Sequence, residues 1–511
     1  MSHVMSSLAV LCALCTAQPL VAQSSTPAPA VGTSVTIYSS ADVRGFDPQQ
    51  FIAQQRAGVD PNMIWGVPGF GVVRETREVS LKKGLNSLSF TDVAAFIDPT
   101  TVGFVDLTHA GTSVIEQRFE FDLVSPSKLY ERYVGREVRL VPQARPETAI
   151  TGVLLASNQG QFVVDTADGL AVVPAEGIRA ELLGELPGGL LTKPTLLWTL
   201  NAETEGKRTI RTTYQTAGLT WRADYNLVLN ATDNAASLTP WVTLLNVSGA
   251  AFENTQLRLV AGDVQRVQAP QPMLRAPSRA TGGVAAEAAA GFEEESLLEY
   301  HLYTLPRPAS ITQNATQQLA LFPPVPEVAV TKQLIYVGAP NYYGWEGGRL
   351  TDEDVGEGSN RKVGVFVSLK NDEASGLGKP LPKGRVRVYK AAGDGTLEFV
   401  GEDVIDHTPK NETIRLKLGD SFDVTGKRTR TNFRSNQKGK EMVESFRIEL
   451  KNAKREAQKV EVREALYRWS NWDITEKSQD FRKLNARAIA FDVEVPAEGS
   501  ATVEYTVRYT W

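Results

Sequence analysis

Histidines and cysteines are the side chains most able to do acid–base or covalent chemistry at neutral pH, and they are sparse here. The chain has 4 histidines in 511 residues; three of them, His109, His301 and His407, lie far apart. No Gly-x-Ser-x-Gly turn occurs, and the 2 cysteines, Cys12 and Cys15, lie near the N-terminus. We therefore predict that the protein is not an enzyme and has neither catalytic residues nor a cofactor. Because catalytic triads assemble in space, a hydrolase with an unrecognised site is the alternative. We expect His407, in the sequence DHTPKNE, to cap backbone groups in a turn.

Four carboxylates lie close together in the sequence RLTDEDVGEGSN, at Asp352, Glu353, Asp354 and Glu357. Clustered carboxylates can bind Ca²⁺ through their oxygens, although this spacing differs from that of an EF-hand loop. We interpret the segment as a solvated acidic loop, with a Ca²⁺ site as the alternative. The sequence contains no His-Glu-x-x-His pair for zinc and no Walker A run for phosphate, so we predict no metal or nucleotide site.

Aromatic residues gather in a glycine-rich stretch, NYYGWEGG, at Tyr342, Tyr343 and Trp345. Aromatic rings in a loop can stack on sugar rings or contact another protein. The simpler interpretation is a loop that folds back onto a sheet. We retain the three residues as candidate contacts with a ligand or partner.

A second candidate surface is basic. The sequence TGKRTRTNFRSNQKGK, residues 425–440, contains Arg428, Arg430 and Arg434 and three lysines but no acidic residue. A solvated hairpin arm is the default interpretation. The alternative is a contact with an anionic polymer of the cell envelope, and the affinity of such a contact should fall with added salt.

The first residues resemble a secretory signal peptide. An apolar run from Leu8 to Ala17 is followed by small residues, so we place the signal at residues 1–23. The run is shorter than the roughly 20 residues that a membrane-spanning helix needs, and no later stretch is apolar enough. We therefore expect a periplasmic or cell-envelope protein with no transmembrane helix in the mature chain. The net charge of −5 does not favour nucleic acid as a partner.

The elements that must position these residues are strands, because apolar and polar residues alternate along most of the chain. Val363, Val365, Val367 and Leu369, for example, would share one face of a strand. One apolar and one polar face are typical of antiparallel sheets that are wet on one side. We predict an all-β protein of antiparallel β-sandwich domains, Ig-like at the C-terminus, with a small SH3-like barrel inserted in the N-terminal half.

The stretch GLTWRADYNLVLN places Trp221 and Tyr225 on the same face of such a strand. A large aromatic side chain on the inner face of a sandwich buries much apolar area. We therefore interpret Trp221 as part of the core, with a ligand platform as the alternative.

Shifts in composition predict the domain boundaries. The expected parts are a signal peptide at 1–23, an N-terminal β domain at 24–133, a small β-barrel insertion at 134–195, a central β-sandwich at 196–379 and a C-terminal Ig-like β-sandwich at 380–511. Residues 268–326, rich in Ala, Pro and Gly, are expected to form a flexible insertion in the central domain.

Four stretches are distinctive as a set: YQTAGLTWRADYNLVLN, PWVTLLNVSGAAFENTQLRLVAGDVQ, GKPLPKGRVRVYK and VEVREALYRWSNWDI. They resemble the bacterial DUF4139 family, whose relatives include mucoidy inhibitor-like proteins, and the resemblance covers about Val35 to Trp511. It implies a β-rich envelope protein and carries no reaction or catalytic residue. The long coiled-coil helices that many relatives insert between the two halves are absent, and the small barrel segment stands in their place.

These observations together predict a non-enzymatic exported cell-envelope protein, a β-sandwich binding or scaffold module of unknown ligand. The expected partner is an envelope protein or an anionic polysaccharide. An outer-membrane-associated β protein is another alternative, because the chain ends in VEYTVRYTW, an alternating apolar run that closes on an aromatic residue.

Overall fold

The structure is a computed structural model. It describes residues 32–39, 46–49, 52–53, 67–120, 126–158, 160–183, 193–262, 264, 292–343, 347–357 and 359–511. The predicted signal peptide and Trp345 lie outside these residues. The described chain is mostly β-strand in several largely antiparallel sheets, which confirms the predicted all-β fold class. Within the described residues, no helix is long and apolar enough to cross a membrane.

The N-terminal part is a sandwich of two sheets. The larger sheet has the order β16-β17-β15-β1-β2-β12-β4, with β18 beside β15, and the smaller has the order β3-β11-β5. Their bounds are β1 Gly32–Tyr38, β2 Phe70–Leu81, β3 Gly84–Thr91, β4 Ile97–Asp106, β5 Thr112–Glu120, β11 Thr195–Ala202, β12 Gly206–Thr216, β15 Phe252–Ala261, β16 Glu293–Leu297, β17 Tyr300–Thr304 and β18 Ala309–Ile311. Trp198 of β11 is buried between the sheets, with its ring edge-on to Phe90 and Phe104. The sandwich thus combines strands from the predicted 24–133 and 196–379 domains.

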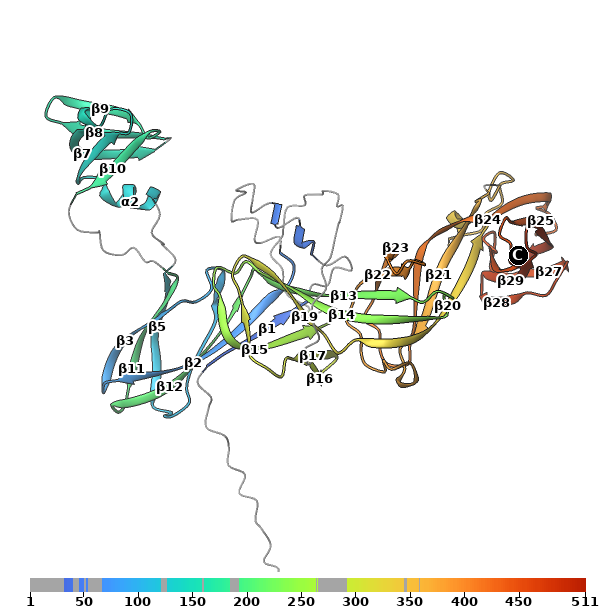
Figure 1. The fold of residues 1–511 in the computed structure, drawn as a ribbon, viewed down its shortest axis with the longest axis horizontal. Helices are drawn as coiled ribbons and strands as arrows, with labels where there is room; N and C mark the ends of the chain where they lie inside the picture. Colours follow the sequence, from blue (N-terminus) through green and yellow to red (C-terminus); the bar gives the residue numbers. More distant parts are fainter. Residues whose placement is uncertain are drawn as a thin grey trace, which may run out of the picture.

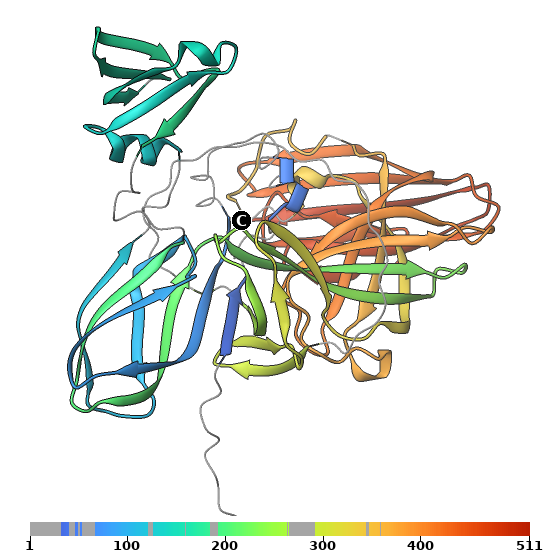
Figure 2. The same ribbon diagram turned by 60° about the vertical axis from the view of Figure 1, so that its left-hand side comes forward.

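A separate five-stranded sheet follows helix α2 (Pro126–Tyr133). Its order is β10-β6-β7-β8-β9, and its bounds are β6 Glu137–Pro142, β7 Ile150–Asn158, β8 Gln161–Thr166, β9 Gly169–Pro174 and β10 Ile178–Leu182, with a 3-10 turn, η2, at Pro146–Thr148. It has its own small core, to which Leu154 and Phe162 belong. Figures 1 and 2 both show it set apart from the other sheets. A small SH3-like barrel was predicted here, but β9 and β10 occupy opposite edges without pairing, so the sheet does not close into a barrel.

The remaining strands form one 14-stranded sheet, with the main order β23-β22-β13-β14-β20-β21-β24-β25-β30-β27 and with β19, β26, β28 and β29 branching from it. Their bounds are β13 Leu219–Leu229, β14 Ala235–Asn246, β19 Ala315–Ala320, β20 Val325–Val337, β21 Lys362–Lys370, β22 Gly384–Ala391, β23 Leu397–Ile405, β24 Thr413–Asn436, β25 Glu441–Asn452, β26 Gln458–Ala465, β27 Trp472–Lys477, β28 Arg482–Asn485, β29 Ala488–Val495 and β30 Ser500–Thr510. Two 3-10 turns, η3 (Pro340–Tyr342) and η4 (Glu373–Ser375), flank β21. The sheet curls at its C-terminal end, so that β29 faces β25 and β30 across a core.

Three strands of this sheet run through two cores. In β20, Val328 belongs to the large N-terminal core and Tyr336 to the C-terminal core. Strand β21 divides in the same way, and the 24-residue strand β24 has Leu416 in the first core and Val424 in the second. Figure 1 shows β20, β21 and β24 extending from the middle of the molecule to its C-terminal end. The two cores are therefore packed against one continuous sheet.

This arrangement does not support the predicted boundary at residue 380. Strand β22 pairs in parallel with β13, and Val386 and Val388 of β22 lie in the first core. The core of the C-terminal sandwich instead takes its residues from β20 and β21 and from the chain from Val424 onward.

The flexible insertion predicted at 268–326 is wrong for its second half. Residues 293–320 form strands β16 to β19, and β20 begins at Val325. The first half lies largely outside the described residues. The short strands of this region pair with β15 and β14, so long-range pairing orders a stretch whose local pattern is weak.

Trp221 is in the core, as predicted. It exposes 1% of its surface, and its indole Nε1 donates to the Val260 carbonyl at 3.3 Å. Tyr225, on the same face of β13, is equally buried and donates to the Pro382 carbonyl at 2.7 Å. Neither side chain is available as a ligand platform.

Candidate functional site

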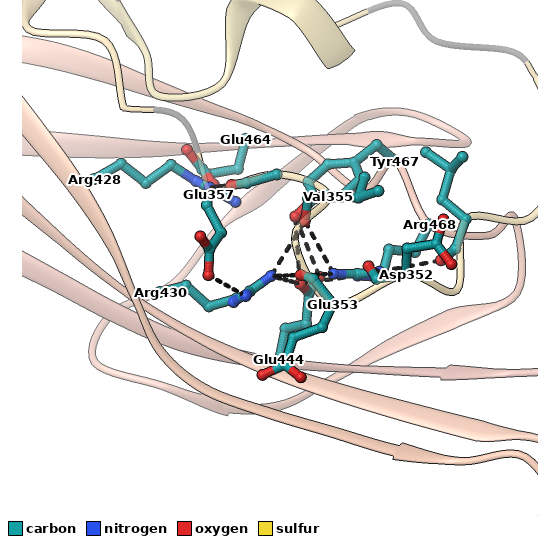
Figure 3. Close-up of polar contacts among 12 residues, drawn as sticks. Asp352, Glu353, Val355, Glu357, Arg428, Arg430, Glu444, Glu464, Tyr467 and Arg468 are labelled. Carbon is teal, nitrogen blue, oxygen red and sulfur yellow. Dashed lines mark hydrogen bonds and ion pairs between the residues drawn. The ribbon is translucent and has the colours of Figure 1, made fainter.

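The predicted basic contact surface is divided by a register shift in β24, between Arg430 and Asn432. Arg428 and Arg430 point inward beneath a loop, as Figure 3 shows, whereas Arg434 is exposed. Arg428 Nε donates to Glu464 Oε2 at 2.8 Å, and both side chains expose at most 1% of their surface. The Arg428 guanidinium also lies 3.7 Å from the centre of the Phe446 ring on β25. Arg428 therefore cannot contact an anionic polymer, contrary to the hypothesis from sequence.

A second buried ion pair lies beside the first. Arg468, just after β26, and Glu444, on β25, are both fully buried, with Nε 2.8 Å from Oε1. Arg430 Nη1 approaches the same carboxylate oxygen at 3.5 Å, and Arg430 Nη2 donates to Glu357 Oε1 at 2.6 Å. Burying a charge is costly unless an opposite charge and hydrogen bonds compensate it, which these contacts supply.

The three arginines hold residues 350–357, which we call the strapped loop. Its backbone carbonyls are directed at the guanidinium groups (Figure 3). Arg468 Nη1 donates to the carbonyl of residue 352 at 2.8 Å, Arg468 Nη2 to that of residue 355 at 3.0 Å, and Arg428 Nη1 to that of Gly356 at 2.7 Å. Arg430 Nη1 donates to the carbonyl of residue 353 at 2.5 Å. Hydrogen bonds from the three arginines to its backbone carbonyls thus hold this short acidic loop in place.

The side chains of Asp352, Glu353 and Asp354 are exposed on this loop. Because guanidinium groups already take the inward carbonyl oxygens, these oxygens are not free to ligate a cation. Within the described residues, no three His, Cys, Asp or Glu side chains are grouped as ion ligands. The three carboxylates therefore face solvent from a loop whose backbone is held in place.

Two tyrosines complete the buried network. Tyr505 Oη donates to Glu464 Oε2 at 2.6 Å, and Tyr467 Oη lies 3.3 Å from Glu444 Oε1. Burial raises the pKa of Tyr467 to about 12, and Glu444 adds to that rise. Burial also raises the pKa of Glu444, which Arg468 opposes. Both hydroxyls stay protonated at neutral pH and donate to the two carboxylates.

The aromatic stretch lies beside the same network. The ring of Tyr342 packs against that of Tyr467, with centroids 4.8 Å apart, and Tyr343 is half-buried. Tyr342 thus folds back onto the C-terminal sandwich, as the simpler interpretation predicts.

The three histidines remain separate. His407 Nδ1 accepts a hydrogen bond from the Lys383 backbone N–H at 3.2 Å, which confirms the backbone-capping prediction. His109 Nδ1 likewise accepts from the Gly111 N–H at 3.0 Å, so its neutral ring carries the proton on Nε2. That nitrogen lies 3.4 Å from Thr204 Oγ1 and acts as donor there, so His109 cannot take a proton from this hydroxyl. His301 pairs at 2.7 Å with Glu294 on a partly exposed hairpin.

Sequence reasoning missed Glu444, Glu464 and Arg468. A signal for Glu444 was present, because it occupies the apolar face of the alternating run Met442, Glu444, Phe446, Ile448. An acidic residue on the inner face of a strand requires a buried cation as its partner. The sequence does not indicate which cation pairs with Glu444, because strand pairing across the fold brings that partner close.

In comparisons with known proteins, no family model and no curated protein matches the chain.

Proposed function

We propose that this chain is a non-enzymatic scaffold and binding protein of the cell envelope, related to the DUF4139 family. The observation that carries the proposal is the sharing of β20, β21 and β24 by both cores. A strand that is packed at both ends resists bending, because bending breaks contacts in two cores. The 24 residues of β24 would extend on the order of 80 Å at about 3.3 Å per residue.

A stiff body of this kind holds surfaces at its two ends at a constant separation. The strapped loop has the same property on a smaller scale, since its backbone is fixed while its carboxylates face solvent. A surface that is ordered before binding loses less conformational entropy when a partner docks. Both features support a role in holding partners rather than in transforming them.

Export to the envelope is part of the proposal and is supported by the N-terminal apolar run. Both cysteines lie inside that run, so a processed chain would have no thiol to oxidise in a disulfide-forming compartment.

The test is cross-linking in intact cells that express the full chain with a C-terminal tag, followed by mass spectrometry of the attached molecules. Release by osmotic shock should accompany recovery of one reproducible envelope partner. A chain that stays in the cytoplasm, or that cross-links only to varying neighbours, would contradict the proposal.

A further inference from the structure

Three half-buried tryptophans lie at one end of the C-terminal sandwich. Trp469 follows β26, Trp472 begins β27 and Trp511 follows β30, and all three pack against the C-terminal core. Trp472 pairs with Tyr509 of β30, and the Trp511 backbone N–H donates to the Lys440 carbonyl at 3.1 Å. The tip of the β24–β25 hairpin therefore meets the end of β30. We call this surface the tryptophan end.

Cations lie directly on these rings. The Arg349 guanidinium carbon is 5.7 Å from the centre of Trp469 and 4.6 Å from that of Trp511. Lys483 Nζ is 4.9 Å from the centre of Trp472. Such contacts hold a cation in place by its attraction to the negative face of the ring.

The same end carries the free part of the basic hairpin. Arg434, Lys438 and Lys440 are exposed. Among the described residues, no carboxylate forms an ion pair with any of these three or with Arg349 or Lys483. This contrasts with Arg428, Arg430 and Arg468, whose charges are compensated inside the sandwich. The nearby Asp473 is 3.5 Å from Arg508. Within the part of the chain that the structure describes, the tryptophan end thus presents five cations that form no ion pair with a carboxylate.

We propose that the tryptophan end binds an acidic polysaccharide, a linear polymer of sugar rings that carry carboxylates. This deepens the proposed function, on which it rests, by naming the surface and the chemical class of one partner. The carboxylates would pair with Arg349, Lys483 and the lysines of the hairpin tip. The exposed parts of the half-buried indoles would pack against the sugar rings beside these cations.

An acidic polypeptide would form ion pairs with the cations, but its carboxylates would not require the tryptophan rings for binding. Repeated sugar and carboxylate groups match the repeated ring and cation of this surface, where Arg349 lies between two tryptophans and Lys483 covers a third. Charge and ring contacts therefore favour the sugar polymer together.

The experiment uses the purified full chain and polygalacturonate as the probe, with calorimetry and tryptophan fluorescence as readouts. The variant Arg349→Gln/Lys438→Gln/Lys440→Gln should weaken binding about tenfold, because it removes three of the unpaired charges. The control variant Lys451→Gln/Arg455→Gln/Lys459→Gln removes equal charge from exposed residues at the opposite end of the sandwich and should bind as the unaltered chain does. Added salt should weaken binding, since exposed charges are screened over about 8–10 Å.

Poly-L-glutamate and neutral dextran distinguish the alternatives. Binding of polygalacturonate that shifts tryptophan fluorescence and exceeds binding of both other polymers supports the proposal. A Trp511→Ala variant should weaken polygalacturonate more than poly-L-glutamate. Equal binding of polygalacturonate and poly-L-glutamate without a fluorescence change would overturn the polysaccharide proposal in favour of an acidic protein partner. Equal loss of binding in the two triple variants would show that the polymer does not bind at the tryptophan end. If no polymer binds while the two cores move as one body, this inference fails and the scaffold role stands.

Discussion

Arg428 and Glu464 form a 2.8 Å ion pair in which neither side chain exposes more than 1% of its surface. The pair connects β24 to β26 across the C-terminal core, and Arg428 continues the connection to Gly356 of the strapped loop. The loop and the two layers of the sandwich are thus tied to one buried guanidinium group. The predictions below follow from this connection and from the sharing of strands between cores.

Removing one partner of the buried pair should be far more damaging than removing both. Glu464→Gln leaves the Arg428 charge buried without its carboxylate and should cost about 3–5 kcal/mol of unfolding free energy, measured in urea by tryptophan fluorescence. Arg428→Met/Glu464→Met should recover most of that loss, because neither member of this pair then leaves a buried charge without its partner.

The matched control is the pair Arg447–Glu504, at 2.6 Å with both side chains 52% exposed. Glu504→Gln should change the unfolding free energy far less than Glu464→Gln, because water screens an exposed pair. Equal effects of Glu464→Gln and Glu504→Gln would contradict the role given to burial.

Gly356 should be irreplaceable for a steric reason. Its φ is +84°, and an added Cβ would collide with the hydroxyl of Tyr467. Gly356→Ala should therefore displace the strapped loop and make it sensitive to limited proteolysis. Gly395→Ala tests the backbone effect alone, because Gly395 has the same φ of +84° and nothing within 4 Å of an added Cβ. Protease resistance that is equal in the two variants would argue against the packing of the loop on Tyr467.

Asp233 should give stability that depends on pH. Burial favours a raised pKa, but hydrogen bonds from Lys332 and Lys390 outweigh it and hold the pKa of Asp233 below its ordinary value of 3.8. A carboxyl group with a lowered pKa stabilises the fold above its unfolded-state pKa and loses that contribution as the pH falls through the folded-state pKa. Asp233→Asn should thus cost about 1 kcal/mol at pH 7, and the difference should shrink below about pH 3.8 in thermal melts.

The control for this prediction is the same Asp233→Asn substitution in a Lys332→Met/Lys390→Met background. There burial acts on the Asp233 carboxyl without the two lysines, so the fall in the stability difference between aspartate and asparagine at low pH should be lost or reversed in sign. In the chain that keeps both lysines, a stability difference between aspartate and asparagine that grows as the pH falls would have the wrong sign for a lowered pKa of Asp233.

The two large cores should unfold together, whereas the five-stranded sheet should unfold separately. Leu416→Ala, in the first core on β24, should cost about 2–5 kcal/mol and should also lower the hydrogen-exchange protection of β25 in the second core. Leu154→Ala lies in the core of the five-stranded sheet and should leave β25 unchanged. Loss of protection confined to the first core in Leu416→Ala would mean that β24 does not couple the two.

Periodicity predicted which side chains are inside, and the reason is geometric. Side chains alternate strictly along a strand, so Val363, Val367 and Leu369 could be assigned to a buried face from spacing alone. The same rule placed Trp221 and Tyr225 in the core.

Periodicity could not predict strand partners or buried charge. The parallel pairing of β22 with β13 joins segments about 160 residues apart, so no local pattern marks the boundary it crosses. Arg428 and Arg430 alternate with polar residues as a solvated hairpin would. Their burial depends on Glu464 and Glu444, which reach them only through the fold.

The most direct test of the scaffold role measures whether the two cores move as one body. Spin labels at Glu398→Cys, on β23, and Lys459→Cys, on β26, in a Cys12→Ser/Cys15→Ser background would report their separation by electron paramagnetic resonance. The pair Lys451→Cys and Lys459→Cys, both within the C-terminal sandwich, provides the width expected for a rigid body. The account predicts one narrow distance distribution across the cores, as narrow as this reference. A broad or multiple distribution would contradict it.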